Sequence, residues 1–141
     1  MLKIRNNSGQ KEIWDPIRKR WVALTQEEEV RQFFIQYLIN DLHINTAYIS
    51  VEKQITLNGT IKRYDILVYN KSWKPWMVVE CKAPGIKLTQ EVIEQAGRYN
   101  NVLKAKIIAI TNGNENRFFY IDFENNQIQE IAIPTADLFE N

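Results

Sequence analysis

The segment from Trp76 to Lys82 constrains the fold more than any other part of this chain. Its first four residues, Trp-Met-Val-Val, are all apolar, which is typical of a strand covered on both faces. The segment then ends in Glu80, Cys81 and Lys82. Charged residues at the end of a buried strand are unfavourable unless they are paired or bind a metal. The sequence therefore predicts a central strand with a polar site at its end.

A second strand is predicted to supply another carboxylate to that site. Residues 63–69 are rich in β-branched and aromatic side chains and carry Asp65, and residues 70–75 form a plausible hairpin loop to the next strand. Because side chains alternate along a strand, Glu80 and Lys82 share one face and Cys81 points to the other. Asp65 on the neighbouring strand can join them. Two carboxylates and a lysine suit metal-assisted phosphodiester hydrolysis: the oxygens hold Mg²⁺, and the lysine orients or deprotonates a water.

The segment after this site predicts a helix and another strand. Thr89 is a suitable N-cap, and apolar residues follow at helical spacing as far as Leu103. Gln95 and Tyr99 are four residues apart, which places them on the same side of that helix, although ordinary amphipathic packing gives the same spacing. A strand over residues 105–111 follows. Ligand sites in open α/β sheets lie at strand ends of this kind.

A second long helix is predicted over residues 26–42, with Thr25 as its N-cap. Its apolar stripe is expected to consist of Val30, Phe33, Phe34, Tyr37, Leu38 and Leu42. On a helical wheel Glu27 lies about 50° from the centre of that stripe and Glu28 about 150°. The spacing therefore favours Glu27 over Glu28 as a residue that reaches the site. A solvated first turn that complements the helix dipole explains both residues equally well.

The remaining elements complete one domain over residues 1–141. Its parts are an N-terminal hairpin extension (1–24, turning at Asp15-Pro16), a core (25–113) and a C-terminal hairpin and tail (114–141). Further strands are expected at 47–57, 117–123 and 127–133, with a short helix at 135–139. The predicted fold class is α/β or α+β, with a mixed sheet of five or six strands and two main helices.

Composition narrows the range of functions. The net charge of +1 argues against an indiscriminately basic DNA-binding protein. Residues 61–106 nevertheless carry nine Lys or Arg against four Asp or Glu, whereas residues 118–141 carry five acidic residues and no basic ones. This distribution suits phosphate contacts beside the site, and solvated surface charge explains it nearly as well. A single cysteine, no apolar leader and no membrane-spanning run predict a cytoplasmic protein without membrane contacts.

The order Asp65, Glu80-x-Lys82 and Gln95-x-x-x-Tyr99 resembles the PD-(D/E)XK nuclease superfamily. More narrowly, the chain resembles the N-terminal nuclease domain of type I restriction enzyme R subunits. Six segments carry the likeness: 14–22, 25–32, 63–69, 79–84, 95–100 and 111–113. Tyr64 departs from the pattern, because it stands where the superfamily name has proline. R subunits also contain a long motor, and none of the five glycines here opens a Gly-x-x-x-x-Gly-Lys-Ser/Thr loop.

The resemblance implies a Mg²⁺-dependent DNA endonuclease in defence against foreign DNA, with Mn²⁺ as a substitute ion. It assigns metal binding to Asp65, Glu80 and the backbone carbonyl of Cys81, with Glu27 as a further candidate. Lys82 takes the catalytic role, and Gln95 and Tyr99 assist around the site and the nucleic acid.

Several questions remain open at the level of sequence. They are the DNA specificity, the oligomeric state (a homodimer included), and whether motor, specificity or methyltransferase subunits are partners. Two alternatives to an enzyme are a non-catalytic nucleic-acid or protein interaction module, and a structural domain whose polar residues are scattered in space.

Overall fold

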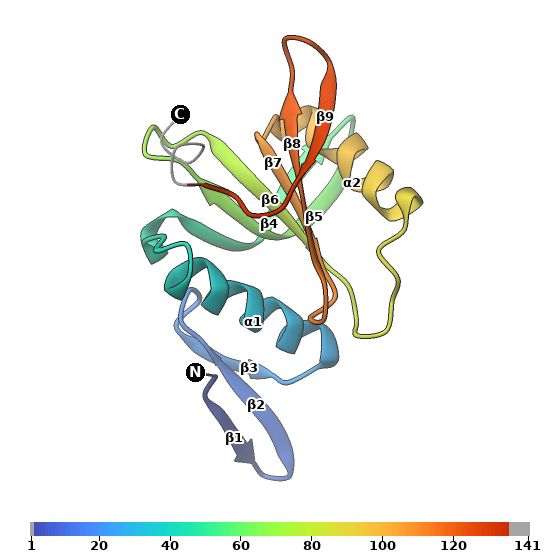
Figure 1. Cartoon of the computed structure of the whole chain (residues 1–141). Helices are drawn as coiled ribbons and strands as arrows, with labels where there is room; N and C mark the ends of the chain where they lie inside the picture. Colours follow the sequence, from blue (N-terminus) through green and yellow to red (C-terminus); the bar gives the residue numbers. More distant parts are fainter. Residues whose placement is uncertain (1, 136–141) are drawn as a thin grey trace.

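A six-stranded mixed sheet forms the centre of the molecule (Figure 1). The computed structural model describes residues 2–135. The strands lie in chain order: β4 (Ile49–Leu57), β5 (Thr60–Tyr69), β6 (Pro75–Cys81), β7 (Ile107–Thr111), β8 (Asn116–Asp122) and β9 (Gln127–Ile131). Only β6 and β7 run parallel among these neighbours, because α2 (Gln90–Leu103) makes the crossover between them. The predicted mixed sheet with two main helices is confirmed.

The two helices cover opposite faces of this sheet. One buried cluster joins α1 (Gln26–Asn40) to side chains that include Ile66, Val79 and Cys81. The other joins α2 to side chains that include Val78 and Ile108. β6 contributes to both clusters and all seven of its residues are at least half-buried. The apolar run before Glu80 is therefore a central strand, as its composition predicted.

The N-terminal residues form a small sheet of their own beyond α1 (Figure 1). The predicted hairpin is present as β2 (Gln10–Asp15) and β3 (Arg20–Ala23). A third strand, β1 (Ile4–Asn7), pairs with β2 and was not predicted. Its sequence is mostly polar and all four of its residues are exposed, so it carries no hydrophobic pattern. The predicted helix at 135–139 lies, apart from Thr135, outside the described residues.

The buried side of α1 differs from the predicted apolar stripe. Phe33 is 53% exposed, whereas Glu28, Arg31 and Gln32 are buried. The stripe was wrong at these positions because it assumed that only apolar residues face the interior. Glu28 was also wrongly placed toward solvent. The buried polar residues share the side of α1 that faces β5 and the N-terminal sheet.

The sheet departs from regular alternation where Glu52 and Asp65 lie opposite each other. On β5, Tyr64 packs on the α2 face and Ile66 on the α1 face, although a regular strand would place both on one face. On β4, Glu52 has a φ of 55°, in the left-handed region that non-glycine residues rarely adopt. The pairing between the two strands skips these two residues. This local break turns both carboxylates toward α1.

Candidate active site

Asp65 is fixed by two hydrogen bonds at the point where β5 and β6 separate. Its Oδ2 accepts from the Cys81 backbone N–H at 2.8 Å, and its Oδ1 accepts from Arg31 Nη2 at 3.0 Å. The first contact ties the carboxylate to the middle of the Glu80-Cys81-Lys82 segment. The second ties it to α1. The side chain is 15% exposed, so Asp65 is held rigidly but still reaches solvent.

Glu80 and Lys82 stand at the end of β6, on either side of Cys81. The Lys82 N–H donates to the Thr111 carbonyl at 2.8 Å, which prolongs the contact between β6 and β7 past the last paired residue. Cys81 is 3% exposed and packs in the α1-face core. Burial raises the pKa of the Cys81 thiol well above its usual range. These properties suit a core residue and not a nucleophile.

One polar cleft of about 600 Å³ brings the predicted residues together. Its lining includes five of them, which come from α1, β5 and the end of β6: Glu27, Asp65, Glu80, Cys81 and Lys82. Glu27 is exposed and borders this cleft from the first turn of α1. Buried Glu28 also lines the cleft, but it is engaged in ion pairs. Of the two glutamates, Glu27 therefore remains the better candidate for reaching a metal.

Gln95 borders the same strand end from the other side. With Lys62, Glu80 and Lys82 it lines a small cavity of about 30 Å³ under α2. Gln95 itself is exposed, so it adds little to the core. The side chain of Tyr99 lies outside the described part of the structure. The predicted placement of Gln95 beside Glu80 and Lys82 is observed, and that of Tyr99 remains a prediction.

Glu80 is a carboxyl group of the cleft with a perturbed pKa. Burial raises its pKa above the usual range, and the nearby Asp65 adds to this, while Lys62 and Lys82 oppose it. Lys62 Nζ lies 3.6 Å from Glu80 Oε1, just beyond hydrogen-bond distance. Among the described residues that buried oxygen has no hydrogen-bond partner. A buried carboxylate oxygen in this state favours an additional cation.

The donor set fits a Mg²⁺ ion. Within residues 2–135, no three His, Cys, Asp or Glu side chains gather as a preformed metal site. The predicted set needs only two carboxylates, Asp65 and Glu80, and the Cys81 carbonyl, because Mg²⁺ usually keeps several waters. The under-satisfied Glu80 oxygen and the fixed Asp65 meet this requirement. Both groups are hard oxygen ligands in a polar cleft.

Sequence reasoning missed three basic residues that shape the site. Lys62 lines the cleft and approaches Glu80, Arg31 binds Asp65, and Arg18 binds Glu28 at 2.8 Å. Lys62 lies outside the segments that carry the family likeness, and Arg18 lies in segment 14–22 but was not singled out there. Arg31 could have been suspected, since it follows Glu28 by three residues and this spacing places an acid and a base together on a helix. Asp65 and Glu80 are thus each held next to a basic side chain.

The raised pKa of Glu80 predicts how stability depends on pH. The folded state binds the Glu80 proton more tightly than the unfolded state does, so ionised Glu80 destabilises the fold above its raised pKa. This penalty disappears as the pH falls through that pKa. We expect Glu80→Gln to melt at a higher temperature than wild type at pH 7, with a smaller difference at pH 4. Exposed Glu94→Gln is the control. A difference that grows toward acid pH would contradict the assignment.

Gln95 provides a test of the helix motif. We expect Gln95→Ala to lower metal-dependent cleavage about tenfold, because the side chain borders the reacting groups. The melting temperature should stay almost unchanged, since an exposed side chain contributes within about 0.5 kcal/mol. Gln90→Ala, on the first turn of the same helix, is the matched control. Full activity in Gln95→Ala would refute the role assigned to this residue.

The chain is similar to known proteins of one family. A family model described as the N terminus of the type I restriction enzyme R protein (HSDR_N) matches residues 26–134. Among solved structures, a fragment of an HsdR subunit of a type I restriction enzyme from Vibrio vulnificus YJ016 is similar at 26% identity and a TM-score of 0.42. The match covers 65% of this chain and 18% of that chain. No curated protein matches.

Proposed function

The chain belongs to the family of type I restriction enzyme R protein N termini, and we propose that it is a Mg²⁺-dependent DNA endonuclease domain acting in defence against foreign DNA. One observation carries the proposal: Asp65, Glu80 and Lys82 line a single polar cleft at the end of the central strand. The raised pKa of Glu80 supports the proposal, because groups with perturbed pKa values cluster at functional sites. The family match covers the whole of this constellation.

In this proposal each residue of the cleft has its own role. Asp65, Glu80 and the Cys81 carbonyl would hold Mg²⁺, with Glu27 as a further candidate. When bound, the ion would supply Lewis-acid stabilisation of the charge that develops on the phosphate. Lys82 orients or deprotonates the attacking water and offsets negative charge in the transition state. Gln95, and by the motif Tyr99, orient Lys82 or the scissile strand.

The substrate and partners follow from the family and are part of the proposal. The substrate would be DNA, whose phosphates suit the basic residues Lys62, Arg63 and Lys82 along the cleft. A type I system would supply motor, specificity and methyltransferase subunits, so the DNA sequence preference would come from a partner. No helix in the described range is long and apolar enough to span a membrane.

A cleavage assay tests the proposal. Supercoiled plasmid is incubated with the wild-type chain in Mg²⁺ or Mn²⁺ and in excess EDTA. We expect nicked and linear products with either ion and none with EDTA. The double variant Asp65→Asn/Glu80→Gln, purified in parallel, should give none under any condition and thereby excludes a contaminating nuclease. Cleavage that persists in EDTA, or an inert wild-type chain in both ions, would contradict the proposal.

One contact supports a second candidate, a non-catalytic nucleic-acid interaction module. Both oxygens of Asp65 already accept hydrogen bonds from protein groups, Arg31 and the Cys81 N–H. A purely structural Asp65 would look the same. This candidate predicts that the chain shifts DNA in a native gel without divalent ions and leaves the DNA uncut when Mg²⁺ is added.

A further inference from the structure

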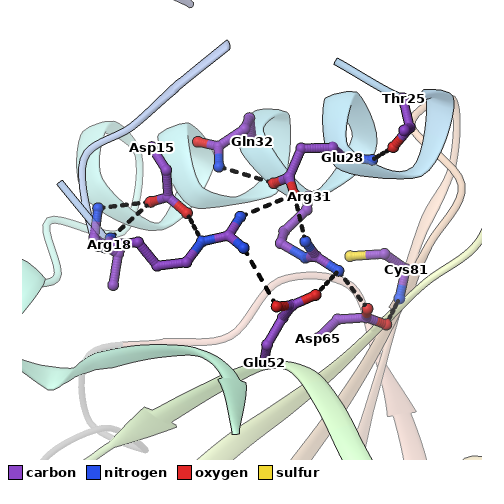
Figure 2. Close-up of polar contacts among 10 residues, drawn as sticks. Asp15, Arg18, Thr25, Glu28, Arg31, Gln32, Glu52, Asp65 and Cys81 are labelled. Carbon is purple, nitrogen blue, oxygen red and sulfur yellow. Dashed lines mark hydrogen bonds and ion pairs between the residues drawn. The ribbon is translucent and has the colours of Figure 1, made fainter. Parts of the chain in front are cut away.

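Arg31 occupies an unusual position for a basic residue, because it lies buried directly beside a predicted metal ligand. Its Nη2 is 3.0 Å from Asp65 Oδ1, and its side chain is only 7% exposed (Figure 2). Burial by itself lowers the pKa of the guanidinium, but Glu28 and Asp65 raise it overall. Arg31 therefore remains a fixed positive charge. A divalent cation that binds Asp65 must meet this charge at close range, and like charges repel strongly in a partly buried site.

Arg31 has other partners besides Asp65. Its Nη1 lies 2.6 Å from Glu28 Oε1, and its Nη2 lies 3.6 Å from Glu52 Oε1 (Figure 2). Glu52 reaches this position through its left-handed backbone, at a φ of 55°. Strained backbone of this kind persists where surrounding contacts require it and is frequent at functional sites. Releasing Asp65 would thus leave Arg31 paired with Glu28 and Glu52.

The ion-pair cluster around Arg31 contains more carboxylates than guanidiniums. The ion pairs around Arg31 join four carboxylates (Asp15, Glu28, Glu52 and Asp65) to two guanidiniums (Arg18 and Arg31). This cluster carries two more negative than positive charges. A divalent ion at Asp65 would neutralise that excess, while Arg31 shifts its pairing to the remaining carboxylates.

We infer that Arg31 competes with the divalent cation for Asp65, holding this carboxylate in place until the ion binds and then yielding it. Arg31 is a positioning residue in this role, since it acts through Asp65. The inference rests on the proposed metal site. In this role Arg31 controls the affinity of the site for the metal. Neither the family match nor the lining of the cleft gives Arg31 that role. Its direct consequence is that removing the positive charge tightens metal binding.

Calorimetric titration of Mg²⁺ in the absence of DNA measures this affinity without turnover. We expect Arg31→Gln to bind Mg²⁺ about tenfold more tightly than wild type, because a like charge is removed. Arg31→Lys keeps the charge and should stay within about threefold of wild type. Arg5→Gln removes an equal charge from an exposed pair with Glu12 and is the matched control; its affinity should not change.

We expect Arg31→Gln to fold, since Glu28 keeps hydrogen bonds from Arg18 Nη2 and Gln32 Nε2. A second measurement tests the inference on the wild-type chain, so that the test does not depend on whether a variant folds. The Arg31 Nε–H resonance, assigned by nuclear magnetic resonance, should shift when Mg²⁺ is added, as the guanidinium leaves Asp65. The Arg5 Nε–H resonance should not shift.

The outcomes separate this inference from the proposed function. Tighter binding by Arg31→Gln, together with a Mg²⁺-dependent shift of the Arg31 resonance, supports the inference. If every variant binds Mg²⁺ as wild type does, or Arg31→Gln binds it more weakly, the inference fails and the metal site stands. An Arg31 resonance that ignores bound Mg²⁺ also refutes it. If no form of the protein binds Mg²⁺, both the inference and the proposed function fall.

Discussion

Replacing Lys82 with alanine should reduce Mg²⁺-dependent DNA cleavage by about 10²–10⁴-fold, the usual contribution of a positioned acid–base group. Lys82 is the lysine of the Glu-x-Lys pattern, and it lines both the large cleft and the small cavity beside Gln95. The fold should survive, because the bond that fixes this position runs from the Lys82 backbone N–H to Thr111. An alanine makes the same bond.

Controls for Lys82→Ala come from the same segment of chain. Exposed Lys87→Ala removes an equal charge five residues further on and should cleave like wild type. Melting curves of both variants should stay within about 0.5 kcal/mol of wild type. A Lys82→Ala protein that keeps full activity would exclude the assigned chemistry. A wild-type protein that binds DNA but never cuts it would instead favour the interaction module.

The largest loss of stability is expected for Arg18→Ala. Arg18 bonds to Asp15 through Nε and to Glu28 through Nη2 (Figure 2). Asp15 is fully buried. Without the Arg18 side chain, the Asp15 carboxylate keeps the backbone N–H donors of Ile17 and of residue 18. Removing one partner of a buried ion pair destabilises a protein by about 3–5 kcal/mol, because a buried charge is left uncompensated.

Chemical denaturation of Arg18→Ala and of a surface control measures this effect. Arg5→Ala breaks an exposed pair with Glu12 and should change the free energy of unfolding by no more than about 1 kcal/mol. Equal, small losses in the two variants would show that the Arg18 network contributes little. A large loss for Arg18→Ala would show that the N-terminal sheet is joined to α1 and β4 by charge as well as by packing.

The sequence predicted correctly those elements that a local pattern of residues marks clearly. The apolar run before Glu80 predicted a central strand, and β6 is buried on both faces. Thr25 and Thr89 predicted both helix starts, and each threonine side chain accepts a backbone N–H of its helix. The spatial order of the strands was not predicted; in the structure, neighbouring segments pair in sequence along the whole sheet.

Sequence reasoning failed where polar residues are buried in pairs. Glu28 and Arg31 satisfy each other and become interior residues, which a pattern of apolar side chains cannot reveal. The break at Glu52 and Asp65 was also beyond prediction, since it depends on a backbone conformation that nothing in the glutamate side chain requires. Both failures concern the environment of Asp65. The motif located the site, and the structure supplied the charges that surround it.

Anomalous scattering from crystals grown with Mn²⁺ tests most directly whether a divalent ion binds between Asp65 and Glu80. We expect a single strong peak within ligand distance of Asp65, Glu80 and the Cys81 carbonyl. We also expect Arg31 to turn from Asp65 to Glu28 and Glu52. A cleft with no peak, or a Mn²⁺ ion bound elsewhere while Arg31 still holds Asp65, would contradict the proposed metal site.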